Sequence, residues 1–200
     1  MTFQQIVDMV LAGSFDETKR EHAKAWVNSR YGMLLDLETW SFMRSTDTVT
    51  VTAGSRVVTG LPDDFGIGMA LLDDNGDPLI AVGDPSEFLV TYPSDTDQST
   101  PEAWTQIGAS VMVGPASDET NTSWTIVYER AHVDMTNDQS VPIVPTQYHL
   151  TIVHGAKAEG MRMLGIPLWQ EHEEAWMAGI EAMRRKYLAT VRAAGARVWS

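Results

Sequence analysis

The sequence of 200 residues contains no cysteine. Disulfides, thiolate metal sites and cysteine nucleophiles are therefore excluded, although this absence does not identify the redox compartment. No apolar run approaches the roughly 18–20 residues that are needed to span a bilayer, so we expect no contact with a membrane. Residues 1–4 carry no basic side chain, so we also expect no signal peptide.

Basic residues are scarce in the middle of the chain. Residues 46–140 hold two of them, Arg56 and Arg130, against sixteen acidic residues, a net charge of −14 within a chain whose total is −13. Such a segment repels phosphates within a Debye length of about 8–10 Å. This charge argues against ordinary nucleic-acid binding by that segment.

The motifs of common catalytic sites are also missing. The sequence has no phosphate-binding glycine loop with Lys and Ser/Thr, no dinucleotide fingerprint and no G-x-S-x-G elbow. His149 and His154 are five residues apart on a predicted helix and point in different directions, and the segment around His172 lacks the second histidine of a zinc-protease helix. We therefore expect no catalytic residue, no metal and no cofactor, and so no enzyme.

Helical patterns occupy both ends of the chain. Thr2 and Gln5 have the spacing of a capping box, and Ser14 with Glu17 predicts a second one, which opens a helix that runs to about Thr39. From Thr48 onwards the apolar period changes to two. This pattern predicts about seven short strands, at residues 48–52, 56–59, 67–72, 79–82, 103–107, 110–113 and 123–130.

The helical tail that follows is the most strongly patterned stretch. It breaks at Ile166 and Pro167, and beyond that break two rows of apolar residues recur every seven positions. We expect these to pack against the opening helices or against a neighbouring copy; the expected interface residues are Trp169, Trp176, Ile180, Met183 and Tyr187. The last twenty residues carry five basic residues against the single acid Glu181, which suggests a docking element.

The order of helices, strands and helices predicts an α+β fold. We expect the N- and C-terminal helices to pack as a helical bundle, with a central small antiparallel β-barrel or sandwich. The predicted domains are a helical bundle of residues 1–45 and 146–200 and a β domain of residues 46–145, with acidic loops at residues 93–101 and 114–122.

Several short motifs follow one another along the chain. They are residues 40–43 (WSFM), 61–65 (LPDDF), Pro101 with Trp104, 113–115 (VGP), 127–130 (VYER), and 142–145 (PIVP) with Tyr148. Taken in this order, the sequence resembles the head-to-tail adaptor proteins of tailed bacteriophages, including the tail tubular adaptors of short-tailed phages. The likeness covers about residues 26–187.

The resemblance implies a structural virion protein, assembled in the host cytoplasm and placed at the neck beneath one capsid vertex. Such adaptors form a homo-oligomeric ring, usually of twelve copies, under the portal protein. The ring extends the channel through which genomic DNA passes without specific binding, and it offers the attachment surface for tail or further neck proteins. In several members the C-terminal segment reaches into the portal; here that role falls on Arg184, Arg185, Lys186, Arg192, Arg197 and Trp199.

Two alternatives stay open at this point. The many acids and the seven tryptophans suit a tail-associated hydrolase of cell-wall polysaccharide, or a carbohydrate-binding β module without catalysis. Asp73, Asn75 and Asp77 have the spacing of calcium ligands, but Pro78 stands where an EF-hand loop requires glycine. A hairpin turn is therefore the preferred interpretation of this run.

Overall fold

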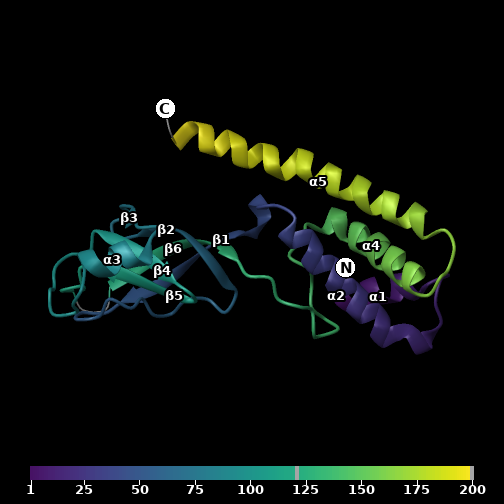
Figure 1. Cartoon of the computed structure of the whole chain (residues 1–200), viewed down its shortest axis with the longest axis horizontal. Coiled ribbons are helices and arrows are strands. Elements are labelled where there is room, and N and C mark those ends of the chain that lie inside the picture. Colours follow the sequence, from purple (N-terminus) through teal and green to yellow (C-terminus); the bar gives the residue numbers. More distant parts are fainter. Residues whose placement is uncertain (120–121, 199–200) are drawn as a thin grey trace. The chain divides into compact units, whose positions relative to one another are not determined.

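The computed structural model describes the backbone of residues 1–119 and 122–198, and the side chains of these residues up to Leu188 (Figure 1). The chain divides into two compact units. The helical unit contains Met1–Met43 and His132–Ser200, and the β unit contains Arg44–Ala131. Each unit is described by itself below.

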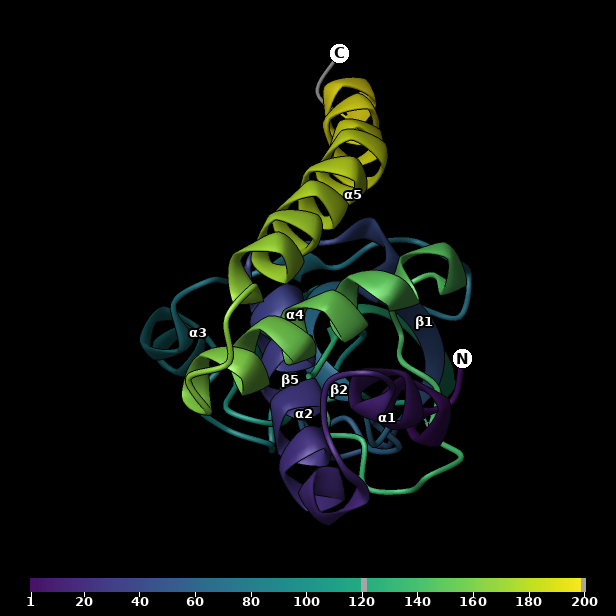
Figure 2. The ribbon, with the colours of Figure 1, turned by 90° about the vertical axis from the view of Figure 1, so that its right-hand side faces the viewer.

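Four helices build the helical unit: α1 (Phe3–Leu11), α2 (Arg20–Asp36), α4 (His149–Met163) and α5 (Trp169–Val198). Helix α4 packs against the other three, as Figure 2 shows. Three 3-10 turns flank these helices: η1 (Glu17–Lys19) precedes α2, η2 (Ser41–Met43) follows it, and η3 (Thr146–Tyr148) precedes α4. The N- and C-terminal helices thus share one apolar core, which is the predicted bundle.

The first helix start is as predicted and the second is not. Thr2 and Gln5 form the capping box of α1, with Gln5 N donating to Thr2 Oγ1 at 3.3 Å and Thr2 N to Gln5 Oε1 at 2.9 Å. The prediction that Ser14 caps the next helix was wrong. Ser14 N donates to Leu11 O, so Ser14 belongs to the turn that ends α1. The carboxylate of Asp16 accepts from Thr18 N and caps η1, and α2 begins only at Arg20.

The β unit contains two small sheets. In the first, β1 (Arg44–Val51) and β2 (Phe65–Leu72) flank β6 (Thr122–Arg130), and both pairings are antiparallel. In the second, β4 (Ala103–Ile107) lies between β3 (Ile80–Ala81) and β5 (Ser110–Gly114). The β3–β4 pair is parallel, contrary to the antiparallel expectation, because helix α3 (Pro85–Thr91) supplies the crossover between them.

Side chains of both sheets form one core, so the described strands are two open sheets packed over a shared core and not a closed barrel. Its buried members include Val49, Leu71, Trp124 and Ile126 from the first sheet, and Trp104, Val111 and Val113 from the second. The predicted strand at residues 56–59 is not regular. Thr59 bridges to Thr50 in β1 and Val57 bridges to Met112 in β5, so this segment contacts both sheets without extending either.

The extended segment after β6 packs with the helices. Asn28 of α2 donates from Nδ2 to Met135 O and accepts from Met135 N, each at 3.1 Å, and Ile143 N donates to the Tyr31 hydroxyl at 3.1 Å. These bonds satisfy backbone groups of a segment that has no secondary structure of its own. Residues 132–145, which the sequence assigned to the β domain, therefore belong to the compact helical unit.

Candidate functional site: the α4–α5 pair and the C-terminal helix

Glycines allow α4 and α5 to approach closely. A Cβ at Gly155 of α4 would lie 2.5 Å from the Trp176 ring, and a Cβ at Gly179 of α5 would lie 2.2 Å from Thr151 Oγ1. A Cβ at Gly160 would likewise lie 2.5 Å from the ring of Trp26 in α2. Mid-helix glycine costs about 1 kcal/mol relative to alanine, so these positions carry a packing requirement. These three glycines were not among the residues predicted from the sequence, although glycine inside a helical pattern was the available signal.

A buried ion-pair cluster joins three of the helices. Arg30 of α2 is 3% exposed, and its Nε lies 2.9 Å from a carboxylate oxygen of Glu159 in α4. Its Nη2 lies 3.1 Å from Glu173 in α5, and its guanidinium lies 5.5 Å from the centroid of the Trp176 ring. A buried guanidinium requires such partners, because an unpaired buried charge is strongly destabilising. The cluster therefore fixes how α5 sits on α2 and α4.

Two histidines meet where α5 begins to pack on α4. The Nδ1 atoms of His154 and His172 are 3.0 Å apart, so one ring donates to the other. Burial lowers the pKa of both imidazoles, and the nearby ammonium of Lys157 lowers both further. For His172, the proximity of His154 also lowers the pKa. The pair is therefore neutral near pH 7 and joins the two helices as an uncharged hydrogen bond.

The expected interface residues of α5 lie in different environments. Trp176, Ile180 and Met183 are buried in the core of the helical unit, so contacts with another copy must use other side chains. Tyr187 is half-buried and packs edge-on against Phe42. Trp169 is half-buried and lies beside Arg162 at the α4–α5 corner.

The basic residues predicted to dock on a portal are only partly described. Arg184 is engaged within the unit: its Nε lies 3.0 Å from a carboxylate oxygen of Glu38 and its Nη1 lies 2.6 Å from one of Glu181. Arg185 and Lys186 are exposed on α5. The side chains of Arg192 and Arg197, and all of Trp199, lie outside the described residues.

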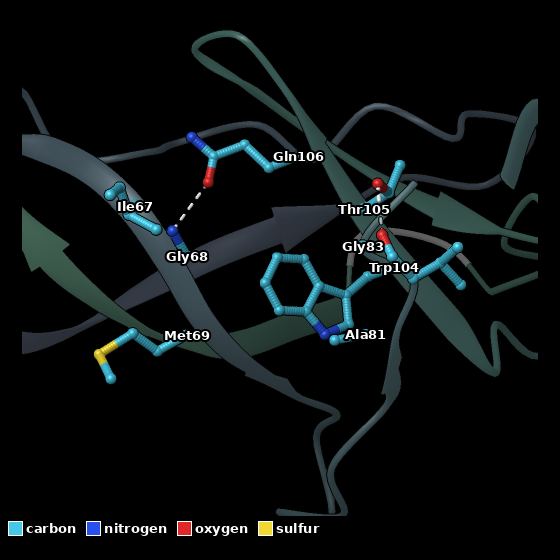
Figure 3. A pocket seen from close by; sticks show the side chains of 9 residues that line it. Ile67, Gly68, Met69, Ala81, Gly83, Trp104, Thr105 and Gln106 are labelled. Carbon is cyan, nitrogen blue, oxygen red and sulfur yellow. Dashed lines mark hydrogen bonds between the residues drawn. The ribbon is translucent and has the colours of Figure 1, made fainter. Parts of the chain in front are cut away.

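The β unit has a groove of about 280 Å³ between β2 and the β3–β4 pair (Figure 3). The Trp104 ring lies beneath Gly68, whose Cβ position would be 2.9 Å from that ring. Two polar side chains that line the groove are already bonded: Gln106 Oε1 accepts from Gly68 N, and Thr105 Oγ1 donates to Val82 O, each at 2.8 Å. Trp104 Nε1 is buried and has no hydrogen-bond partner among the described residues. The groove carries no titratable side chain among its lining residues, so its chemistry is that of an apolar contact surface.

The features behind the alternative functions have structural explanations. Asp73 Oδ1 accepts from Asn75 N at 2.9 Å and from Asp77 N at 2.8 Å, which is the bonding of a tight turn. Five tryptophan rings are buried, and a buried ring cannot stack on a sugar; they are Trp26, Trp40, Trp104, Trp124 and Trp176. Among the described residues, no three or more histidines and carboxylates are placed to hold a metal ion. In that same part of the chain, no helix has the length and apolarity for a membrane span.

Comparison with known proteins identifies the family to which the chain belongs. No curated protein matches the chain. The family model described as SU10 adaptor protein matches residues 1–199, almost the whole sequence. This match agrees with the resemblance to phage adaptors that the order of sequence motifs suggested. The chain therefore belongs to the SU10 adaptor protein family, a family of structural head-to-tail adaptors of bacteriophages.

Proposed function

We propose that this protein forms a ring, of twelve copies as in most such adaptors, beneath the portal at the capsid vertex. In this proposal the ring extends the DNA channel and presents the surface on which the tail or the next neck protein assembles. Its C-terminal segment, from Lys186 to Trp199, docks on the portal. The family match supports the adaptor role, and the course of α5 supports the docking role.

Helix α5 is the observation that carries the docking proposal. It has 30 residues, but its buried contacts with the helical unit end near Met183 and Tyr187. The helix then continues to Val198, and in Figure 2 its C-terminal end projects away from α1, α2 and α4. A helix that extends beyond its own bundle has length available for a partner. The last 17 residues of the sequence contain five basic residues and no acidic one, so the partner's contact surface is expected to be acidic.

An exposed apolar corner supports assembly with other chains. Met163 at the end of α4 is 67% exposed, and Leu168 just before α5 is 61% exposed. Leu164, which lies between them in the sequence, is 44% exposed. Contiguous exposed apolar surface is typical of protein interfaces. The corner therefore suits burial between subunits or against a neck protein.

The charge of the β unit suits a conduit for DNA. Residues 44–131 hold fourteen acidic and three basic residues, a net charge of −11. A wall of this sign repels the phosphate backbone, so DNA passes along it without being held. The three basic residues of this segment, Arg44, Arg56 and Arg130, are too few for the basic stripe that nucleic-acid-binding proteins carry.

The docking role is tested by truncation. The full chain and a chain that lacks residues 189–200 are each mixed with purified portal rings at micromolar concentration, and co-elution is measured by gel filtration. We expect the full chain to bind and the truncated chain not to bind. Electron micrographs of the bound complex should show an additional ring.

A second variant separates docking from folding. Replacing Arg192, Arg197 and Trp199 by alanine keeps the helix-forming sequence and removes the charges and the indole. Urea unfolding followed by circular dichroism at 222 nm should show that the helical unit of both variants stays folded, because its buried contacts with α5 end near Met183 and Tyr187. Portal binding by the truncated chain would remove the docking role, and failure of the full chain to bind would contradict the adaptor role itself.

A further inference from the structure

One face of α5 is exposed along its described length. Most of its side chains are three or four residues apart, and the whole set lies on one side of a helix. We call this face the α5 stripe; it consists of Gln170, Glu174, Met177, Ala178, Glu181 and Arg185, all of them exposed. At its N-terminal end the stripe borders a shallow depression of about 390 Å³, which Trp169, Glu174 and Met177 help to line.

Charge is segregated along the same helix. Residues 169–183 hold four acidic residues and no basic one, whereas residues 184–198 hold five basic residues and no acidic one. Some of these charges are neutralised inside the unit, since Glu173 pairs with Arg30 and Glu181 with Arg184. Glu174 and Arg185 form no ion pair with any residue among those the structure describes, although both lie on the exposed stripe.

The helix macrodipole does not explain this distribution. Its effect on charged side chains fades within the first and last turns of a helix. Glu174 lies beyond the first turn of α5, and Arg185 lies thirteen residues before its end at Val198. A second explanation is needed for a helix whose unpaired acid and unpaired base lie on one exposed face.

We propose that the α5 stripe is the contact between neighbouring copies in the ring, with Glu174 of one copy facing Arg185 of the next. This inference rests on the proposed function, because it assumes a ring. The occupant is a second copy because α5 itself carries the complementary charge. Met177 and Ala178 lie between the two charges on the stripe and provide apolar surface. The Met177 side chain is 48% exposed.

The separation of the two charges sets the geometry of the contact. Eleven residues at about 1.5 Å each place Glu174 and Arg185 about 16 Å apart along the helix. Neighbouring helices that are tilted relative to the ring axis and offset by this distance along their length bring the acid of one copy to the base of the next. Each copy then presents the Glu174 end of its stripe to one neighbour and the Arg185 end to the other, a head-to-tail contact that closes into a ring when the rotation between neighbours divides a full turn. An antiparallel pairing would match the same charges but would end at a dimer.

Charge reversal tests the contact. We compare Glu174→Arg, Arg185→Glu and the double variant that carries both changes, and we measure ring formation by mass photometry, alone and on portal rings. Each single variant places like charges together, which should weaken self-association about tenfold or more. The double variant restores opposite charges at every contact and should recover ring formation. Glu87→Arg on helix α3 makes the same charge change at an exposed site outside the stripe and serves as the matched control.

Engineered cysteines distinguish a ring contact from a dimer contact. The natural chain has no cysteine, so Glu174→Cys with Arg185→Cys introduces the only two thiols. Crosslinking with a bifunctional maleimide should give a ladder of covalent dimers, trimers and larger species on a denaturing gel. The control pair Glu174→Cys with Lys186→Cys places the second thiol about 100° around the helix, and we expect it to crosslink weakly.

The outcomes separate this inference from the adaptor role. Rings that form normally in both single charge variants, or a double variant that stays as weak as the singles, would overturn the α5 contact and leave the adaptor role intact. Crosslinking that stops at dimers would overturn the head-to-tail geometry. A wild-type chain that forms no ring, either alone or on the portal, would contradict both proposals.

Discussion

Replacing Gly155 by alanine tests how closely α4 and α5 pack. In an exposed helix this change stabilises the protein by about 1 kcal/mol. Here the new Cβ would lie 2.5 Å from Cε3 and 2.9 Å from Cδ2 of Trp176, whereas carbon atoms normally pack at about 3.5–4.0 Å. The indole would have to move by about 1 Å.

The surroundings of Trp176 determine the cost of that movement. The side chain is 2% exposed and lies beside the Arg30 guanidinium, so it has no open space to enter. Forcing extra atoms into a packed core costs about 1–3 kcal/mol, and this enclosed site should lie at the upper end. After the helix-propensity gain is subtracted, we expect Gly155→Ala to lower the free energy of unfolding by about 2 kcal/mol.

Urea unfolding followed by circular dichroism at 222 nm measures this change, because the signal comes mainly from the helical unit. Trp176→Phe removes much of the ring that a Cβ would meet. In that background, Gly155→Ala should therefore cost much less, which a double-mutant cycle detects. If Gly155→Ala in the natural chain instead raises the free energy of unfolding by about 1 kcal/mol, the close approach of the two helices is refuted.

Two further predictions concern the same helices. Arg30→Ala should lower the free energy of unfolding by about 2–3 kcal/mol, because it leaves Glu159 and Glu173 without their counter-charge; urea titration checks this, and a loss as small as that of an exposed ion pair would contradict it. The helical unit should also lose stability as pH falls below about 6.5, the usual pKa of histidine. Burial lowers the pKa of His154 and His172, so the unfolded chain binds more protons there than the folded one. Thermal melts at pH 7.5 and 5.5 should show a smaller pH effect in His154→Gln with His172→Gln than in the natural chain, and equal pH effects would refute this role.

Most of the fold could be predicted from the sequence because the strongest signals in the chain are local. Alternation of apolar residues fixes which side of a strand faces a core, and the spacing in α5 fixes which side of that helix does. Four of the predicted strands therefore coincide closely with β2, β4, β5 and β6. The capping box at Thr2 is equally local, since its two partners are three residues apart. Ser14 shows the limit of such reasoning, because the competing cap at Asp16 was equally close in sequence.

Other properties depend on residues that are distant in the sequence. Periodicity identified Trp176 and Met183 as apolar contacts, but only tertiary packing decided that they fill the core of their own unit and leave the opposite face of α5 exposed. The partners of Arg30 are 129 and 143 residues away, and no pattern in the chain pairs them. Sequence by itself determined the α+β class, the separation of charge along α5 and the resemblance to phage adaptors. Tertiary structure decided which charges are neutralised and which stay exposed, because pairing depends on distances in space that the order of residues does not specify.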